Sequence, residues 1–200
     1  MTEQLPAAVP ADGPAPHPIH LLVTDDLHRN RLTVFFRLLL VIPHLIVLTL
    51  WGIVIWFVVV IAWVVSIFTG RVPDGLRNFV AMYLRYLTHV YAYLFLAANP
   101  YPGFTGEPGY PVDVEIAPGE SMSRLTIIFR LFLAIPALIV LWVLGYVAEI
   151  VAFFAWFWAL FAGKLHPGLR DVLTYYLRYN AQVVGYLALL TQQYPSFSDD

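Results

Sequence analysis

Ionisable residues inside otherwise apolar segments are the positions of this sequence where chemistry could take place. Arg85 and Arg178 lie near the middle of two apolar segments, and Glu149 is an acidic residue within a third. A lone arginine at a bilayer centre costs at least about 2.5–3.5 kcal/mol, so each must face protein or water. A polar or small stripe with a four-residue period runs through each arginine. The resulting candidate intramembrane polar core is Glu149, Arg178, Arg85, His89 and Gln182.

This core has two possible roles. Glu149 precedes the turn at Gly163 by about 14 residues and Arg178 follows it by about 15, so both lie roughly 20 Å from the turn. We therefore predict an ion pair between them, with Arg85 either stacked on Trp56 or sharing Glu149. The pair either only fixes the register of the helices or forms the ion or substrate site of a small transporter or channel.

Catalytic and cofactor sites are not expected. Sequence motifs for nucleophilic, zinc-dependent or phosphate-binding chemistry do not occur in the 200 residues. His44 and His89 could ligate a haem, but Ala137 and Gln182 stand at the equivalent positions later in the chain. We therefore expect ordinary polar contacts for both histidines. Three further histidines, without cysteine or helical spacing, give no metal site; they are His17, His20 and His28.

The composition predicts an integral membrane protein. Hydrophobic residues make up 60% of the chain and charged residues only 12%, whereas soluble domains carry about a quarter charged residues. A formal net charge of -2 gives no electrostatic surface for nucleic acid. The absence of cysteine excludes disulfides, thiolate metal sites and cysteine nucleophiles.

The elements that would position this core are predicted to be helices long enough to cross a membrane. Residues 1–16 are predicted to be a disordered tail, and an apolar run of about 38 residues begins at Leu32. Pro43 is predicted to divide this run into an interfacial amphipathic helix over 31–42 and a membrane span over 44–68. After a turn, residues 76–98 are long enough to return across the bilayer.

The second half of the chain repeats the first. An offset of 93 residues aligns 18–104 with 111–197 without a gap, and about 35 of the 87 aligned positions are identical. We expect two membrane repeats, 17–104 and 111–197, joined by a linker over 105–110. Each repeat opens with an extended segment, and the two segments either pair as a small ribbon or remain unpaired linkers.

Two spans per repeat predict parallel repeats about an axis along the membrane normal. The fold class is then an all-α membrane protein with four transmembrane helices. A tight hairpin near Trp51-Gly52 would make the number odd, but no polar turn is found there. The interfacial helices carry candidate contacts to lipid headgroups, which are Arg31, Arg37, Arg124 and Arg130. Basic residues are nearly balanced between the two sides; Arg29 and Arg31 before the first apolar run favour both termini inside.

Recurring motifs relate the sequence to a known family. Asn30-Arg-Leu-Thr returns as Ser123-Arg-Leu-Thr, and Tyr83-Leu-Arg-Tyr returns as Tyr176-Leu-Arg-Tyr. These runs resemble a bacterial membrane family catalogued as domain of unknown function 4389, with one copy per repeat. The first copy opens with His17-Pro rather than Tyr-Pro, and the second has Ala137 after its proline rather than histidine. The resemblance implies a small multi-pass membrane protein and supplies no activity, cofactor or catalytic residue.

The expected function is therefore non-enzymatic. Short loops and an aromatic-rich helical surface favour an accessory or scaffolding subunit of a complex in the bacterial inner membrane. Its partners would be the lipid bilayer and other membrane proteins or further copies of the chain, without nucleic acid. One alternative is the transporter or channel described above, and another is a protein that binds anionic lipids through its interfacial arginines.

Overall fold

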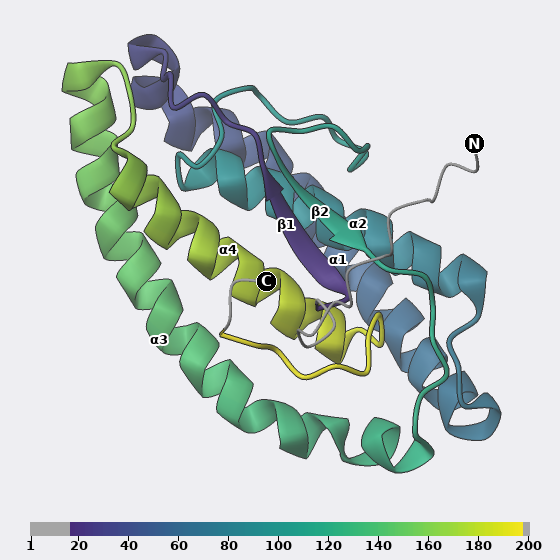
Figure 1. The fold of residues 1–200 in the computed structure, drawn as a ribbon. Coiled ribbons are helices and arrows are strands. Elements are labelled where there is room, and N and C mark those ends of the chain that lie inside the picture. Colours follow the sequence, from purple (N-terminus) through teal and green to yellow (C-terminus); the bar gives the residue numbers. More distant parts are fainter. Residues whose placement is uncertain (1–16, 198–200) are drawn as a thin grey trace, which may run out of the picture.

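The computed structural model describes residues 17–197, which form four helices and two short strands. In chain order these are β1 (Ile19–Val23), α1 (Arg31–Thr69), α2 (Asp74–Leu94), β2 (Val112–Ile116), α3 (Arg124–Ala162) and α4 (Pro167–Leu187) (Figure 1). Each half of the chain contributes a strand, a long helix and a short helix in the same order, as the duplication predicts. The predicted tail over 1–16 lies outside the described residues.

The long helices α1 and α3 each run unbroken through an internal proline. The prediction that Pro43 divides an interfacial helix from a membrane span is wrong, because α1 is continuous over 39 residues and α3 likewise continues through Pro136. A proline removes one backbone hydrogen bond and bends a helix, and the strongly apolar sequence on both sides keeps it helical. Both helices end where a glycine, Gly70 or Gly163, adopts a left-handed conformation.

Only α1 and α3 among the described helices have the length and hydropathy to cross a membrane. Only 17% and 22% of their most apolar windows are buried, so neither resembles the core helix of a soluble protein. The two 21-residue helices, α2 and α4, do not meet the same criterion. Four transmembrane helices were predicted, and two of the described helices have the length and composition to cross a membrane.

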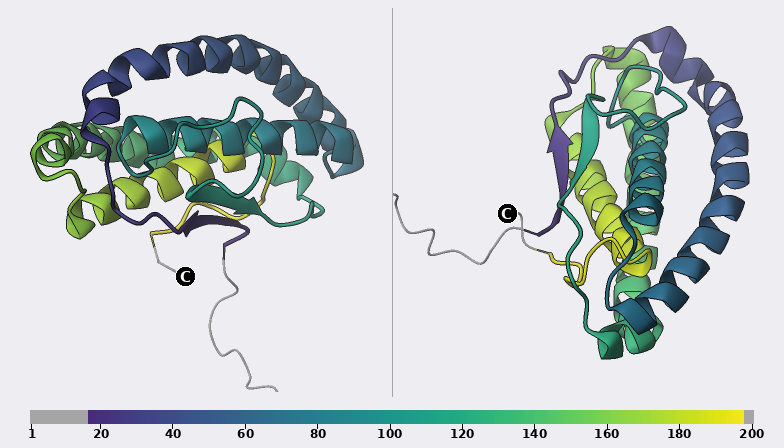
Figure 2. Two further views of the ribbon diagram at one scale, coloured as in Figure 1. Left: turned by 90° about the horizontal axis from the view of Figure 1, so that it is seen from above. Right: turned by 90° about the vertical axis from the view of Figure 1, so that its right-hand side faces the viewer.

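The elements stack in three layers. Figure 2 shows α1 arching over one side of the molecule, the ribbon of β1 and β2 on the opposite side, and α2 and α4 between them. The short helices supply much of the core: Leu84 and Tyr86 of α2 and Leu177 and Tyr179 of α4 are almost completely buried. The outward faces of α1 and α3, in contrast, carry most of the exposed large apolar side chains.

Of the two alternatives for the extended segments, the structure has the paired ribbon, and its register reveals a pseudo-twofold axis. β1 and β2 pair in antiparallel register from Ile19 opposite Ile116 to Val23 opposite Val112. Leu21 faces Val114, its own equivalent at the offset of 93 residues. Every pair is symmetric about that point, so the axis that relates the repeats passes through the centre of the ribbon, perpendicular to its strands.

Each repeat begins beside the turn of the other repeat. The Arg29 amide donates to the Gly163 carbonyl at 3.0 Å, and the Met122 amide donates to the Gly70 carbonyl at 2.7 Å. The predicted parallel arrangement places both repeat starts on one face of the membrane and both turns on the other. The structure corrects it: α1 and α3 run antiparallel and meet at both ends, as Figure 1 shows.

Gly106 allows the linker between the repeats to pack against α2. Its φ is +66°, and a Cβ built there would lie 2.5 Å from the Met82 carbonyl oxygen and 2.9 Å from the Tyr86 amide nitrogen. We predict that Gly106→Ala lowers the free energy of unfolding by about 2 kcal/mol or more, because backbone atoms cannot move aside cheaply.

Thermal unfolding in detergent measures this effect. Gly103→Ala is the matched control, since a Cβ there meets nothing within 4 Å, and it should leave the melting temperature nearly unchanged. Equal melting temperatures for the two variants would contradict the close packing of the linker.

Candidate functional site on the ribbon face

A buried arginine on α1 binds the C-terminal end of α2. Arg37 is 1% exposed, and its Nη1 donates to the carbonyl oxygens of Tyr93 at 2.7 Å and Ala98 at 3.1 Å. Its guanidinium carbon lies 4.3 Å from the centre of the Tyr93 ring. Carbonyls at the end of a helix have no partner within the helix and carry the negative end of its dipole. We call this contact a guanidinium clamp.

The second repeat has the equivalent clamp. Arg130 is fully buried, donates to the Tyr186 carbonyl at the end of α4, and lies 4.4 Å above the Tyr186 ring. The prediction that Arg37 and Arg130 contact lipid headgroups is therefore wrong, because both guanidiniums are buried and donate to carbonyls at the ends of the short helices. Arg31 and Arg124 are exposed, and Arg124 also donates to the Phe68 carbonyl at the end of α1.

A ribbon cluster of Arg85, His89 and Asp113 joins β2 to α2. The Asp113 Oδ1 lies 2.8 Å from the His89 Nε2 and 3.4 Å from the Arg85 Nε. Backbone amides of Gly109 and Val114 also donate to the carboxylate, each at 2.8 Å. His89 and Asp113 are buried. The structure thus brings two of the five predicted core residues, Arg85 and His89, together around a carboxylate that the prediction did not include.

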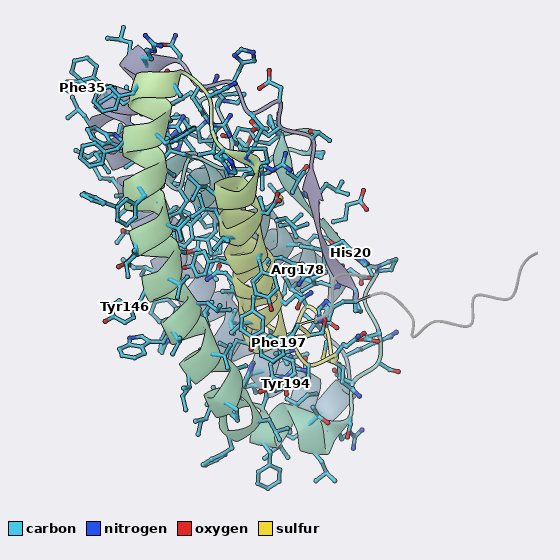
Figure 3. All side chains as sticks on the ribbon, turned by 60° about the vertical axis from the view of Figure 1, so that its left-hand side comes forward. His20, Phe35, Tyr146, Arg178, Tyr194 and Phe197 are labelled. Carbon is cyan, nitrogen blue, oxygen red and sulfur yellow. The ribbon has the colours of Figure 1, made fainter. Side chains whose placement is uncertain are left out.

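The equivalent positions in the other repeat form an open groove instead. Arg178, Gln182 and His20 replace Arg85, His89 and Asp113 at the offset of 93 residues, and they line a cavity of about 330 Å³ between β1 and α4. The Gln182 side-chain oxygen accepts from the Ser196 amide at 3.0 Å. Arg178 donates to the Phe197 carbonyl at 3.2 Å. Figure 3 shows His20, Arg178 and Phe197 on the ribbon side of the molecule.

Glu149 lies apart from the arginines, so the predicted ion pair with Arg178 is wrong. Glu149 is exposed on α3 and shares a pocket with Tyr176 and Asn180 of α4. These two positions face away from Arg178, because two residues advance a helix by about 200°. Equal distance from a turn fixes the height of a residue on its helix but leaves its direction open.

Arg85 likewise has neither of its two predicted partners. It lies beside Asp113, and its guanidinium also donates to the Val114 carbonyl at 3.3 Å. Trp56 is exposed on α1 and packs edge to face with Phe57. The helix α2 turns the arginine toward the ribbon rather than toward the long helices.

The candidate core predicted from the sequence did not include Asp113 and His20, because both lie in segments that are predicted to be extended. The repeat alignment places them at equivalent positions, and a polar residue at both is a signal that could have linked them to Arg85 and Arg178. What sequence reasoning lacked was the face of the short helices that the ribbon covers.

The ribbon cluster is suited to fixing structure. Burial lowers the pKa of His89 below its ordinary value of 6.5, and the nearby charge of Arg85 acts in the same direction, while the hydrogen bond and charge of Asp113 oppose it. The neutral imidazole is then the favoured form in the fold, and its Nε2–H donates to Asp113. His89 thus donates to the Asp113 carboxylate, which also accepts from two backbone amides. These bonds orient β2 on α2.

The guanidinium clamp gives a first prediction at this site. Arg37→Met should lower the free energy of unfolding by about 1–3 kcal/mol, because the Ala98 carbonyl loses the guanidinium donor while the Tyr93 carbonyl keeps the Leu96 amide. Arg31→Met, six residues earlier and exposed, should change it by no more than about 0.5 kcal/mol. Denaturant unfolding in detergent measures both, and equal effects would mean that the clamp does not stabilise the fold.

The lowered pKa of His89 gives a second prediction. An unfolded histidine takes up a proton at higher pH than His89 does in the fold, so stability is present above pH 6.5 and is lost as the pH falls through the lowered value. His89→Gln, which copies Gln182 of the second repeat, keeps a donor and removes this loss. Melting temperatures from pH 8 to pH 5 should therefore fall less steeply for the variant; parallel profiles would contradict the role of His89.

Comparison with known proteins places the chain in a family. No curated protein and no solved structure matches it. A family model described as Domain of unknown function (DUF4389) matches residues 31–105 and again residues 124–199. The first match begins with α1 and the second with α3, so each covers one long and one short helix. The chain therefore belongs to this family of domains of unknown function and contains two tandem copies of its domain.

Proposed function

We propose that this protein is a non-enzymatic integral membrane protein that serves as an accessory or scaffolding subunit of a complex in the bacterial inner membrane. The observation that carries the proposal is the division of its surface. Most exposed large apolar side chains lie on α1 and α3, whereas the buried polar groups of the clamps and the ribbon cluster bind one another or the backbone. Such a molecule offers surfaces for lipid and for partners.

Of the multi-pass topology expected from the sequence, this proposal keeps insertion into the bilayer and leaves out the four crossings. The two long helices support insertion into the bilayer, while the antiparallel α1 and α3 do not support four crossings. His17 precedes β1, and Phe197 contacts Arg178 beside β1. The first and last described residues thus share the ribbon side, in accord with two termini on one side of the membrane. We propose that this side is cytoplasmic.

The transport alternative required Glu149 and Arg178 to face one another. They line pockets on opposite faces of α4, so no observation favours that alternative. The lipid-binding alternative retains only the exposed Arg31 and Arg124 of its four arginines.

Purification from native membranes in mild detergent, followed by native mass spectrometry, tests the proposed function. We expect partner proteins in constant stoichiometry. Glu149→Gln should leave the recovery of these partners unchanged, and so should the control Tyr146→Phe on the same face of α3. A chain recovered alone, together with a solute flux in liposomes that Glu149→Gln abolishes and Tyr146→Phe does not, would instead show a transporter.

A further inference from the structure

We infer that this protein lies within one leaflet of an anionic phospholipid bilayer, with α1 and α3 nearly in the membrane plane and the ribbon in water. The inference rests on the proposed membrane function and names the surface and the lipid that it contacts. The lipid-contacting surface is the outward face of α1 and α3, which we call the apolar face.

The apolar face is too long to cross a bilayer. Exposed apolar side chains extend on α1 from Leu32 to Phe68, a length of about 54 Å at 1.5 Å per residue. The hydrocarbon core is about 30 Å thick. Fitting that length into the core would need a tilt of about 56°, beyond the 0–40° found for transmembrane helices. The equivalent stretch of α3, from Leu125 to Phe161, has the same length.

The ribbon excludes an orientation in which the long helices cross the membrane. The pseudo-twofold axis passes through Leu21 and Val114, so these residues lie midway between the two ends of the antiparallel long helices. In any crossing orientation they would lie at the bilayer midplane. The exposed Glu115 and the open outer edges of a two-stranded ribbon would then contact hydrocarbon, where exposed sheet edges do not occur.

The remaining orientation sets the axis along the membrane normal. The apolar face then points into the lipid and the ribbon points away from it. Figure 3 shows this division: Phe35 and Tyr146 protrude from the side opposite to His20 and Arg178. The duplicated sequence also predicts an axis along the membrane normal. In this orientation, however, the long helices lie perpendicular to that axis instead of parallel to it.

Basic residues border the apolar face at both ends. Exposed Arg31 and Lys164 lie where α1 begins and α3 ends, and exposed Arg124 and Arg71 lie at the opposite end. Cations at the rim of an apolar surface bind anionic headgroups at the level of the interface. Exposed Asp74 and Glu120 also line the pocket at Arg71, so the choice of anionic phospholipid over a second copy rests on the exposed cations Arg31, Lys164 and Arg124.

Glu149 is accommodated in this orientation. It is exposed on α3 and lines a pocket with Tyr91, Tyr176 and Asn180 of the short helices, so polar side chains lie on one side of its carboxylate. Its equivalent in α1, Trp56, lines an apolar pocket with Leu131 and Leu187.

Single-cysteine variants test the orientation, because the natural sequence has no cysteine. Arg71→Cys and Lys164→Cys mark the two ends, Glu115→Cys marks the ribbon, and Phe57→Cys marks the apolar face. A membrane-impermeant maleimide is applied to spheroplasts and to inside-out vesicles. We expect the first three variants to react in the same preparation, at least about ten-fold faster than in the other, and Phe57→Cys to react only after detergent is added.

Three outcomes would overturn the inference. Reaction of the two ends from opposite sides would show that the long helices cross the membrane, and the proposed membrane function would stand. Disulfide crosslinks between Phe57→Cys chains would show that a second copy covers the apolar face. Recovery of the chain without membranes in the soluble fraction would refute the proposed function as well. Ser121→Cys, exposed near Met122, replaces Arg71→Cys if that variant melts at a lower temperature than the parent chain.

Discussion

The contact between a buried guanidinium and the carbonyls at a helix end holds each repeat together. Arg37 would be unfavourable in a helix as apolar as α1 without acceptors, and its Nη1 finds them in the carbonyls of Tyr93 and Ala98 at the end of α2. These bonds and the stacking on the Tyr93 ring fix the short helix against the long one. In the first repeat Arg29 adds a second set of such bonds, to the carbonyls of Leu96 and Ala97. These bonds add to the apolar contacts of α2, whose Leu84 and Val90 are completely buried.

The duplication completes what one repeat leaves open. A single copy would have one strand without a partner, and isolated strands are not stable in water. Pairing of β1 with β2 joins the repeats on one side, and indole hydrogen bonds join them on the other: Trp63 donates to Leu187 and Trp156 donates to Val34. The two tryptophans are equivalent at the offset of 93 residues. Equivalent tryptophans thus join the repeats through different partners: Trp156 of α3 binds α1, and Trp63 of α1 binds the end of α4.

Local signals in the sequence predicted the repeats, the extended segments and the turns, whereas the pairing of those segments and the directions of side chains could not be obtained. Glycine at 70 and 163 marks the helix ends because its left-handed conformation is local. The run through Pro43 was divided because a proline weakens a helix without showing whether its neighbours compensate. Glu149 and Arg178 were paired by depth alone, and only the packed helices show that they face apart. Hydropathy recorded that α1 is apolar, but the same hydropathy suits a helix that crosses a bilayer and one that lies in it.

The central arginine and tyrosine of each clamp recur in both copies, whereas Arg29, which adds bonds in the first repeat, is replaced by Met122 in the second. Arg37 and Tyr93 are repeated as Arg130 and Tyr186, whereas Asp113 with His89 on one side of the ribbon becomes His20 with Gln182 on the other. The first combination closes a buried cluster and the second leaves a groove of about 330 Å³. The groove is thus one place where the two sides of this pseudo-symmetric molecule differ, and it lies beside the ribbon, between β1 and α4.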